Sequence, residues 1–151
     1  MSTKLEKADL AAGCFWGIQE ALDQLSGVVK TEVGYEGGST DNPTYEQVCS
    51  YTTGHAETVQ VIFDPTKLSY KELLAKFFEL HDPTQANGQG LNIGDNYRSA
   101  IFYHSDEQKN QAQQIIQKLG ASLTKPIVTQ VVKAQTFWPA EDYHQNYYAK
   151  Q

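Results

Sequence analysis

Cysteine is scarce in this sequence, and no long apolar run is present. The chain has only two cysteines, Cys14 and Cys49. Two cysteines cannot form a disulfide framework for a domain of this size, so we expect both to be free thiols in a reducing compartment. No stretch approaches the roughly eighteen apolar residues of a membrane span. Residues 1–10 mix both charges and lack the apolar core of a secretory signal. These features predict a cytoplasmic protein.

Basic residues are in the minority. Twelve Lys and Arg against eighteen Asp and Glu give a formal net charge of −6, which argues against nucleic acid or an anionic membrane as a partner. The four histidines, His55, His81, His104 and His144, have no close paired spacing with a cysteine or with one another. We therefore expect no metal site and no bound cofactor.

The composition is otherwise that of an ordinary globular domain. Hydrophobic residues make up 40% of the chain and charged residues 20%, close to the average of folded proteins. Because no linker, repeat or low-complexity tract interrupts the sequence, we expect a single domain over residues 1–151. Two long irregular stretches, residues 36–44 and 82–96, are rich in Gly, Asn, Asp and Pro and are typical of functional loops.

Hydrophobic periodicity predicts alternating strands and helices. Apolar residues at helical spacing predict a first helix that ends before Gly27, a second that begins after Ser69, and a third between Ser105 and Gly120. Ser69 and Ser105 each precede a glutamate or glutamine by three residues, which is the spacing of a capping box. Runs rich in apolar, β-branched or aromatic residues predict five strands, at 8–12, 28–35, 58–63, 98–103 and 127–132.

The order of these elements is strand, helix, strand, then strand, helix, strand, then helix and strand. This order predicts an α/β fold, a two-layer sandwich or roll with a ferredoxin-like split βαβ core. We expect the helices to pack mainly on one face of the sheet.

The segment Gly13-Cys14-Phe15-Trp16-Gly17 connects the first predicted strand to the first predicted helix. At a helix N-terminus, free backbone N–H groups and the helix dipole lower the pKa of a thiol from about 8.5 and favour a nucleophilic thiolate. The flanking glycines permit close approach of the backbone to a ligand. The alternative is an inert buried cysteine. Phe15 and Trp16 are either core aromatics or the wall of an apolar pocket, and we expect at least one of them to border the site.

Further motifs make the sequence recognisable. Together with the segment around Cys14 they show that the chain resembles the peptide methionine sulfoxide reductase A family over nearly its whole length. The motifs are Gly34-Tyr35-Glu36-Gly37-Gly38, Tyr45-Glu46-Gln47-Val48-Cys49, Thr53-Gly54-His55-Ala56-Glu57, Phe77-Phe78 before His81-Asp82-Pro83-Thr84, Tyr97-Arg98-Ser99, and Ala140-Glu141-Asp142-Tyr143-His144-Gln145-Asn146-Tyr147.

The resemblance implies a single catalytic domain that reduces the S epimer of methionine sulfoxide, free or in oxidised proteins. A sulfoxide sulfur is electrophilic, but its oxygen is a poor leaving group until it is protonated, so the reaction needs a thiolate and a proton donor. Cys14 and Glu57 occupy the family's positions for these two groups. Glu57 begins a predicted strand among apolar residues, where burial would raise its pKa and keep it protonated. Without the resemblance, a surface glutamate would be the simpler interpretation.

The resemblance also assigns the substrate pocket. Tyr45 and Tyr97 match the two phenols that hydrogen-bond the sulfoxide oxygen. Phe15 and Trp16 match the aromatic pocket that accepts the methyl group on sulfur. Reduction would release methionine and leave a sulfenic acid on Cys14.

One departure from the family's pattern lies in the loop before Tyr97. That loop commonly reads Gly-Asn-Asp, with the aspartate hydrogen-bonding into the site, and here it reads Gly90-Leu91-Asn92. Asn92 therefore stands at the position of a substrate-binding carboxylate. Its amide lacks the negative charge that would help to keep Glu57 protonated.

A second departure concerns recycling. Many members carry a recycling cysteine beyond the Tyr-His-Gln motif, and this chain reaches Gln151 without one. Cys49 lies where the family has a non-catalytic cysteine, so we expect it to be structural rather than a resolving thiol. We expect an external thiol, either thioredoxin or glutathione with glutaredoxin, to reduce the sulfenic acid directly.

Two other functions stay open at the level of the residues. Cys14 and one histidine would form the acyl-transfer pair of a cysteine hydrolase, and a non-catalytic module would bind methionine-like side chains beside Phe15 and Trp16. Cys14→Ser separates a module from a reductase, because only binding would survive it. His55 and His144 flank motifs and are either structural or order the site through hydrogen bonds. Nothing in the sequence indicates a stable oligomer, so we expect a monomer.

Overall fold

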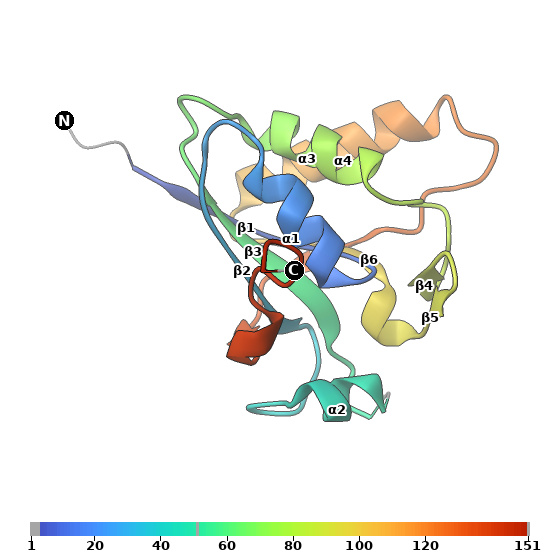
Figure 1. The fold of residues 1–151 in the computed structure, drawn as a ribbon. Helices are drawn as coiled ribbons and strands as arrows, with labels where there is room; N and C mark the ends of the chain where they lie inside the picture. Colours follow the sequence, from blue (N-terminus) through green and yellow to red (C-terminus); the bar gives the residue numbers. More distant parts are fainter. Residues whose placement is uncertain (1–3, 51, 151) are drawn as a thin grey trace.

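A six-stranded mixed sheet forms the centre of the computed structural model, which describes residues 4–50 and 52–150. Its strand order is β7-β6-β1-β3-β2-β8 (Figure 1). A separate two-stranded hairpin joins β4 (Gly88–Gln89) to β5 (Asn92–Ile93). The strands of the main sheet are β1 (Glu6–Ala12), β2 (Val28–Glu36), β3 (Ala56–Phe63), β6 (Ser99–Tyr103), β7 (Gln130–Lys133) and β8 (Trp138–Pro139).

Helices α1 and α3 lie on one face of this sheet, and α4 lies beside α3 (Figure 1). The short helix α2 and the last 3-10 turn, η2, lie near the end of the sheet at which β2 ends and β3 begins. The helices are α1 (Phe15–Asp23), α2 (Tyr45–Cys49), α3 (Tyr70–Glu79) and α4 (Asp106–Gly120), with 3-10 turns η1 (Asp95–Tyr97) and η2 (Asp142–His144).

The connectivity is that of a split βαβ unit. Strand β3 pairs antiparallel with both β1 and β2, so β1 and β2 run parallel with β3 between them. Strand β6 pairs antiparallel with β1 on its other side and parallel with β7. The predicted α/β fold class with a ferredoxin-like core is confirmed, and the five predicted strands are all present. Helix α2, strand β8 and the β4–β5 hairpin were not predicted.

The predicted helix starts are present, with one difference in capping. Ser69 accepts from the N–H of Glu72, whose side chain accepts from the N–H of Ser69, so α3 begins with a full capping box. Ser105 accepts from the N–H of Gln108 at the start of α4. The second half of that box is missing because the Gln108 side chain accepts from the N–H of His104 and donates to β1 instead.

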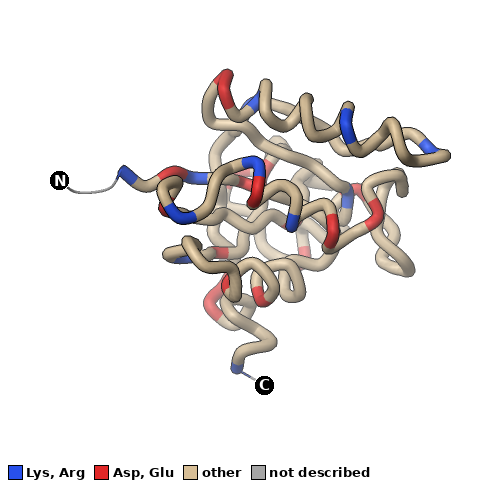
Figure 2. Tube along the Cα trace, turned by 90° about the horizontal axis from the view of Figure 1, so that it is seen from above, with Lys and Arg blue, Asp and Glu red and all other residues tan. Residues whose placement is uncertain are grey.

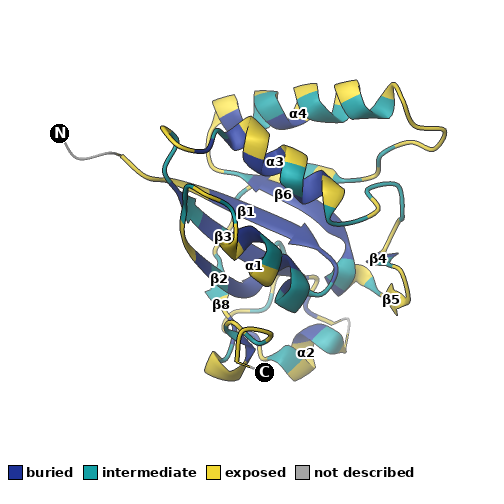
Figure 3. Cartoon of the chain, turned by 45° about the horizontal axis from the view of Figure 1, so that its top comes forward, coloured by how far each residue is buried: buried dark blue, intermediate teal, exposed yellow. Residues whose placement is uncertain are grey.

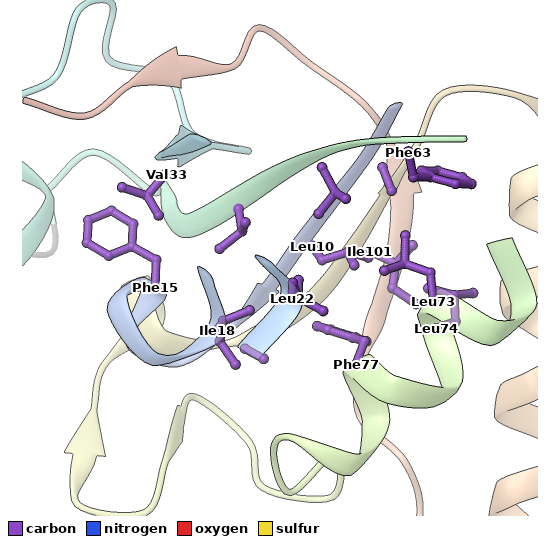
Figure 4. Packing of buried hydrophobic residues seen from close by; sticks show 14 of the residues in the cluster. Leu10, Phe15, Ile18, Leu22, Val33, Phe63, Leu73, Leu74, Phe77 and Ile101 are labelled. Carbon is purple, nitrogen blue, oxygen red and sulfur yellow. The ribbon is translucent and has the colours of Figure 1, made fainter. Parts of the chain in front are cut away.

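The main core lies between the sheet and helices α1 and α3. Side chains alternate along β1, so Leu10 faces the helices and Asp9 faces the opposite side. Figure 4 shows side chains of α1 and α3 meeting those of the strands. Full burial of one such leucine or phenylalanine contributes about 1.5–3 kcal/mol. The labelled members are Leu10, Phe15, Ile18, Leu22, Val33, Phe63, Leu73, Leu74, Phe77 and Ile101.

A buried carboxyl pair lies on the opposite face of the sheet. Asp9 and Glu36 are fully buried, and Asp9 Oδ2 and Glu36 Oε1 have no hydrogen-bond partner unless one carboxyl is protonated. Burial, together with the neighbouring Asp9, holds the pKa of Glu36 well above its usual range. His104 Nε2 lies 3.1 Å from Asp9 Oδ2. We conclude that the two carboxyl groups share a proton.

Lys and Arg alternate with Asp and Glu along much of the trace (Figure 2), but every charged residue between Lys30 and Lys67 is acidic. Within residues 4–50 and 52–150, no helix has the length and apolar character needed to cross a membrane.

Candidate active site

Cys14 occupies the junction predicted from its motif. Strand β1 ends at Ala12, Gly13 turns the chain with φ +82°, and Cys14 is the N-cap of α1. A side chain on Gly13 would be strained at this φ, and its Cβ would lie 2.9 Å from the Cβ of Gln89. The turn therefore requires glycine and leaves Cys14 half-buried at the start of the helix.

The environment of Cys14 corrects one sequence-based expectation. Burial raises the pKa of the Cys14 thiol above its usual range, and the Glu57 carboxylate raises it further. The N–H groups of Trp16 and Gly17 act in the predicted direction and lower it, but they do not outweigh burial. Cys14 is therefore a thiol in the free protein, and the thiolate has to be formed against this bias.

Glu57 lies next to Cys14 in space. It is the second residue of β3 and is only 1% exposed. Its Oε1 accepts from the backbone N–H of Phe15 at 3.3 Å, and its Oε2 accepts from Asn96 Nδ2 at 3.4 Å. Burial raises the pKa of Glu57 to about 7, while the bonds from Phe15 and Asn96 lower it. A carboxyl group that is half protonated near neutral pH therefore adjoins the thiol.

The phenols of Tyr45 and Tyr97 reach the same place from two other segments. Tyr45 begins α2, whose N-cap Thr44 forms a capping box, and Tyr97 ends η1. Burial raises the pKa of Tyr45, and the charge of Glu57 raises it further. The same two causes raise the pKa of Tyr97, and a hydrogen bond with Tyr45 acts in the opposite direction. Both phenols therefore stay neutral hydrogen-bond donors at physiological pH.

Phe15 and Trp16 diverge from the first turn of α1. Phe15 is buried in the core, with its ring 5.8 Å from Tyr35. Trp16 is half-buried and stacks on Tyr147 at 3.9 Å. Its indole N–H donates to Nδ1 of His144 at 3.0 Å. Phe15 thus packs into the core, whereas Trp16 is held against Tyr147 and His144 with part of its ring exposed.

His144 is a site residue whose importance the sequence left open. It is buried on η2 and is 4.4 Å from the ring of Tyr45 and 5.4 Å from that of Phe15. Burial lowers its pKa. Because Nδ1 accepts from Trp16, the neutral ring carries its proton on Nε2, which has no hydrogen-bond partner among the described residues.

Glu141 ties the C-terminal segment to the site and was also missed. Its Oε1 accepts from the hydroxyl of Tyr35 at 2.9 Å, and its Oε2 accepts from the backbone N–H of Tyr45 at 3.2 Å. The carboxylate therefore joins β2, the start of α2 and the segment that carries His144. Its place in the Ala-Glu-Asp-Tyr-His-Gln motif was the only signal available in the sequence.

Asn92 lies differently from the expected position. It is exposed on β5, and the amide that contacts Glu57 belongs to Asn96 of η1, which is 2% exposed. Asn96 Oδ1 has no hydrogen-bond partner among the described residues. Asn96 is therefore the side chain through which this loop acts on Glu57.

Cys49 and His55 lie at the edge of the site. Cys49 ends α2, is half-buried and hydrogen-bonds the phenol of Tyr45. His55 accepts from the N–H of Gly38 at 3.0 Å and contacts Thr40 O at 2.7 Å, so it orders the loop after β2. Among the described residues, no group of three or more His, Cys, Asp or Glu could hold a metal ion.

These residues come from five separate segments and define a class of site, in which a cysteine at a helix start lies near a buried acid, two phenols and several aromatic rings. Comparison with known proteins agrees with this class. A family model described as peptide methionine sulfoxide reductase matches residues 6–151. A peptide methionine sulfoxide reductase MsrA of Methanosarcina acetivorans is 56% identical over 149 residues, which cover 97% of this chain and 79% of that protein.

Solved structures share the fold over almost the whole chain. Methionine sulfoxide reductase A of Corynebacterium diphtheriae has a TM-score of 0.94 at 36% identity, covering 97% of this chain and 75% of that one. Reduced Mxr1 of Saccharomyces cerevisiae has a TM-score of 0.93 at 35% identity, covering 98% and 86%. Mxr1 in complex with Trx2 is similar in fold, with a TM-score of 0.68 at 24% identity, covering 97% and 89%. The chain belongs to the peptide methionine sulfoxide reductase family.

Proposed function

We propose that this protein reduces the S epimer of methionine sulfoxide to methionine, with Cys14 as the nucleophile and Glu57 as the proton donor. The observation that carries these roles is the buried Glu57 carboxyl, whose Oε1 accepts from the N–H of the residue after Cys14. Its pKa of about 7 suits a group that must hold a proton at neutral pH and release it in the transition state.

The reaction transfers oxygen from substrate to enzyme. The Cys14 thiolate attacks the sulfoxide sulfur, and the sulfoxide oxygen takes a proton from Glu57. The attack forms a bond between the two sulfurs, and the sulfur–oxygen bond breaks. The departing hydroxide then adds to the sulfur of Cys14 while the sulfur–sulfur bond breaks and its electron pair leaves with methionine, so that Cys14 is left as a sulfenic acid. The substrate sulfur is reduced by two electrons, and the sulfur of Cys14 is oxidised by two.

The phenols and the two aromatic side chains hold the two ends of the sulfoxide group. Tyr45 and Tyr97 donate hydrogen bonds to the oxygen, which makes the sulfur more electrophilic before proton transfer. Phe15 and Trp16 receive the methyl group. The oxygen and the methyl group each have a fixed place in the site. Only one epimer can then present its sulfur to Cys14 with the rest of its side chain directed out of the site, which accounts for S selectivity.

A small external thiol or a thioredoxin completes the cycle. The thiol attacks the sulfenic acid and releases water, and a second thiol cleaves the resulting mixed disulfide. The yeast relative crystallised with thioredoxin Trx2 supports a protein reductant of this kind. Glutathione with glutaredoxin is the alternative. Such thiols belong to reducing compartments, which supports the cytoplasmic location expected from the sequence.

The function is tested by offering the two separated epimers of free methionine sulfoxide to the enzyme with dithiothreitol as reductant. We expect wild type to consume the S epimer and leave the R epimer, and Cys14→Ser to consume neither. Turnover of both epimers, or ester hydrolysis with an acyl group on Cys14, would overturn the assignment. Full turnover by Cys49→Ser and the absence of a Cys14–Cys49 disulfide by mass spectrometry are expected for direct recycling, and such a disulfide would contradict it.

A further inference from the structure

The β4–β5 hairpin carries a large apolar side chain that is fully exposed. Leu91 is 100% exposed in the turn between Gln89 and Asn92, and Ile93 on β5 is 60% exposed. Figure 3 shows β5 as an exposed strand. Single exposed apolar residues are common on soluble proteins, so the position of Leu91 decides whether it has a role.

The hairpin is braced rather than loose. Gln89 accepts from the N–H of Asp82 at 2.7 Å and donates to its carbonyl at 2.6 Å. Gln85 accepts from the N–H of Gly90 at 2.8 Å and donates to its carbonyl at 3.2 Å. Gln89 therefore joins the hairpin to the backbone of Asp82, and Gln85 holds the turn through the backbone of Gly90. Leu91 is presented in a fixed place, which lowers the entropic cost of binding to it.

The same hairpin packs against the turn that carries the catalytic thiol. Gln89 contacts Gly13 so closely that a Cβ on Gly13 would lie 2.9 Å from the Gln89 Cβ, and Cys14 is the next residue. Leu91 is two residues beyond Gln89. An extended chain spans about 3.3–3.6 Å per residue, so Leu91 is within reach of residues a few positions away from a sulfoxide side chain bound at Cys14.

We infer that Leu91 forms an apolar subsite for residues that flank the oxidised methionine in a polypeptide substrate. This inference rests on the proposed function and names its preferred substrate. Methionine is mostly buried in folded proteins, and its oxidation disrupts apolar cores. The segments that need repair therefore expose apolar neighbours of the oxidised residue. A fixed leucine at the entrance to the site matches that chemistry, whereas a free amino acid is too small to reach it.

The test compares short blocked peptides in which methionine (S)-sulfoxide is flanked by leucine or by serine, with free methionine (S)-sulfoxide as the third substrate. Dithiothreitol is the reductant in all assays. We expect wild type to favour the leucine-flanked peptide by about tenfold in kcat/KM, which corresponds to about 1.4 kcal/mol. Leu91→Asn should reduce this preference to near unity and leave the free amino acid unaffected.

Leu5→Asn is the matched control, because Leu5 is 44% exposed and precedes β1, at the opposite end of that strand from Cys14. It should leave all three rates unchanged. An unaltered leucine preference in Leu91→Asn would overturn the inference, as would equal losses on all three substrates. So would an effect seen only when thioredoxin replaces dithiothreitol, which would make the hairpin a reductant contact. Failure of wild type to reduce the free S epimer would instead contradict the proposed function.

Discussion

Glu57→Gln removes a titratable proton from the site while keeping the size of the side chain and an oxygen for the N–H of Phe15. In wild type the productive state pairs an ionised Cys14 with a protonated Glu57. It holds the same number of protons as the resting state, which has a neutral thiol and a carboxylate. The fraction of protein molecules in the productive state is therefore constant between the pKa values of Glu57 and Cys14. It falls at pH values below the lower pKa and above the higher one.

The magnitudes follow from the two environments. The pKa of Glu57 is about 7, and burial raises that of Cys14 above its usual range. Because the carboxyl group is the stronger acid of the two, the productive arrangement is the minor one. The pH profile of kcat/KM should be a bell, with an acid limb near pH 7 and an alkaline limb at the higher pKa of Cys14. Loss of the proton donor should lower kcat/KM by about 10²–10⁴-fold.

The assay is kcat/KM for free methionine (S)-sulfoxide across this pH range, together with the rate at which iodoacetamide alkylates Cys14. In Glu57→Gln the acid limb should move from pH 7 to the pKa of the Cys14 thiol, because only the thiolate fraction then limits the rate. The pKa reported by alkylation should fall, because the carboxylate that raised it is gone. Glu46→Gln, the same change at an exposed position of α2, is the control. An acid limb that stays near pH 7 in Glu57→Gln, or activity within about threefold of wild type, would refute the reasoning.

Three further changes test neighbouring features. Asn96→Asp should raise the pKa of the proposed acid and move the acid limb to higher pH, whereas Asn92→Asp, at an exposed position, should move it less; a larger shift for Asn92→Asp would contradict the placement. His144→Leu should raise KM about threefold to tenfold, because the indole N–H loses its acceptor; an unchanged KM would argue against this positioning role. In wild type the raised pKa of Glu36 stabilises the fold at low pH, and this contribution is lost as pH rises from the unfolded value toward the folded one. Glu36→Gln keeps a permanent donor toward Asp9, so its melting temperature relative to wild type should increase with pH, and a constant difference would exclude the shared proton.

The sheet and the three longer helices could be predicted because their side chains repeat at the period of the structure they form. Ser69 and Gly27 mark helix ends by local chemistry that needs no tertiary contact. Helix α2 has five residues, too few for a hydrophobic period. The capping box between Thr44 and Gln47 was the signal that would have found it.

Parts of the site depend on burial, which a local pattern does not report. The helix start at Cys14 was predicted, but burial reverses the expected direction of its pKa shift. Asn96 reaches Glu57 because η1 turns it inward, whereas the family's loop motif points to Asn92 instead. The bond between Trp16 and His144 joins residues 128 positions apart, and nothing near either residue signals it.

The central claim is that the sulfur of Cys14 takes the oxygen of the substrate. The most direct test is a single turnover of methionine (S)-sulfoxide without any added thiol, followed by dimedone labelling and mass spectrometry of the enzyme. The account predicts one methionine released per protein molecule and one sulfenic acid, located on Cys14. Methionine formed with Cys14 still a thiol, or a sulfenic acid found on Cys49 instead, would contradict it.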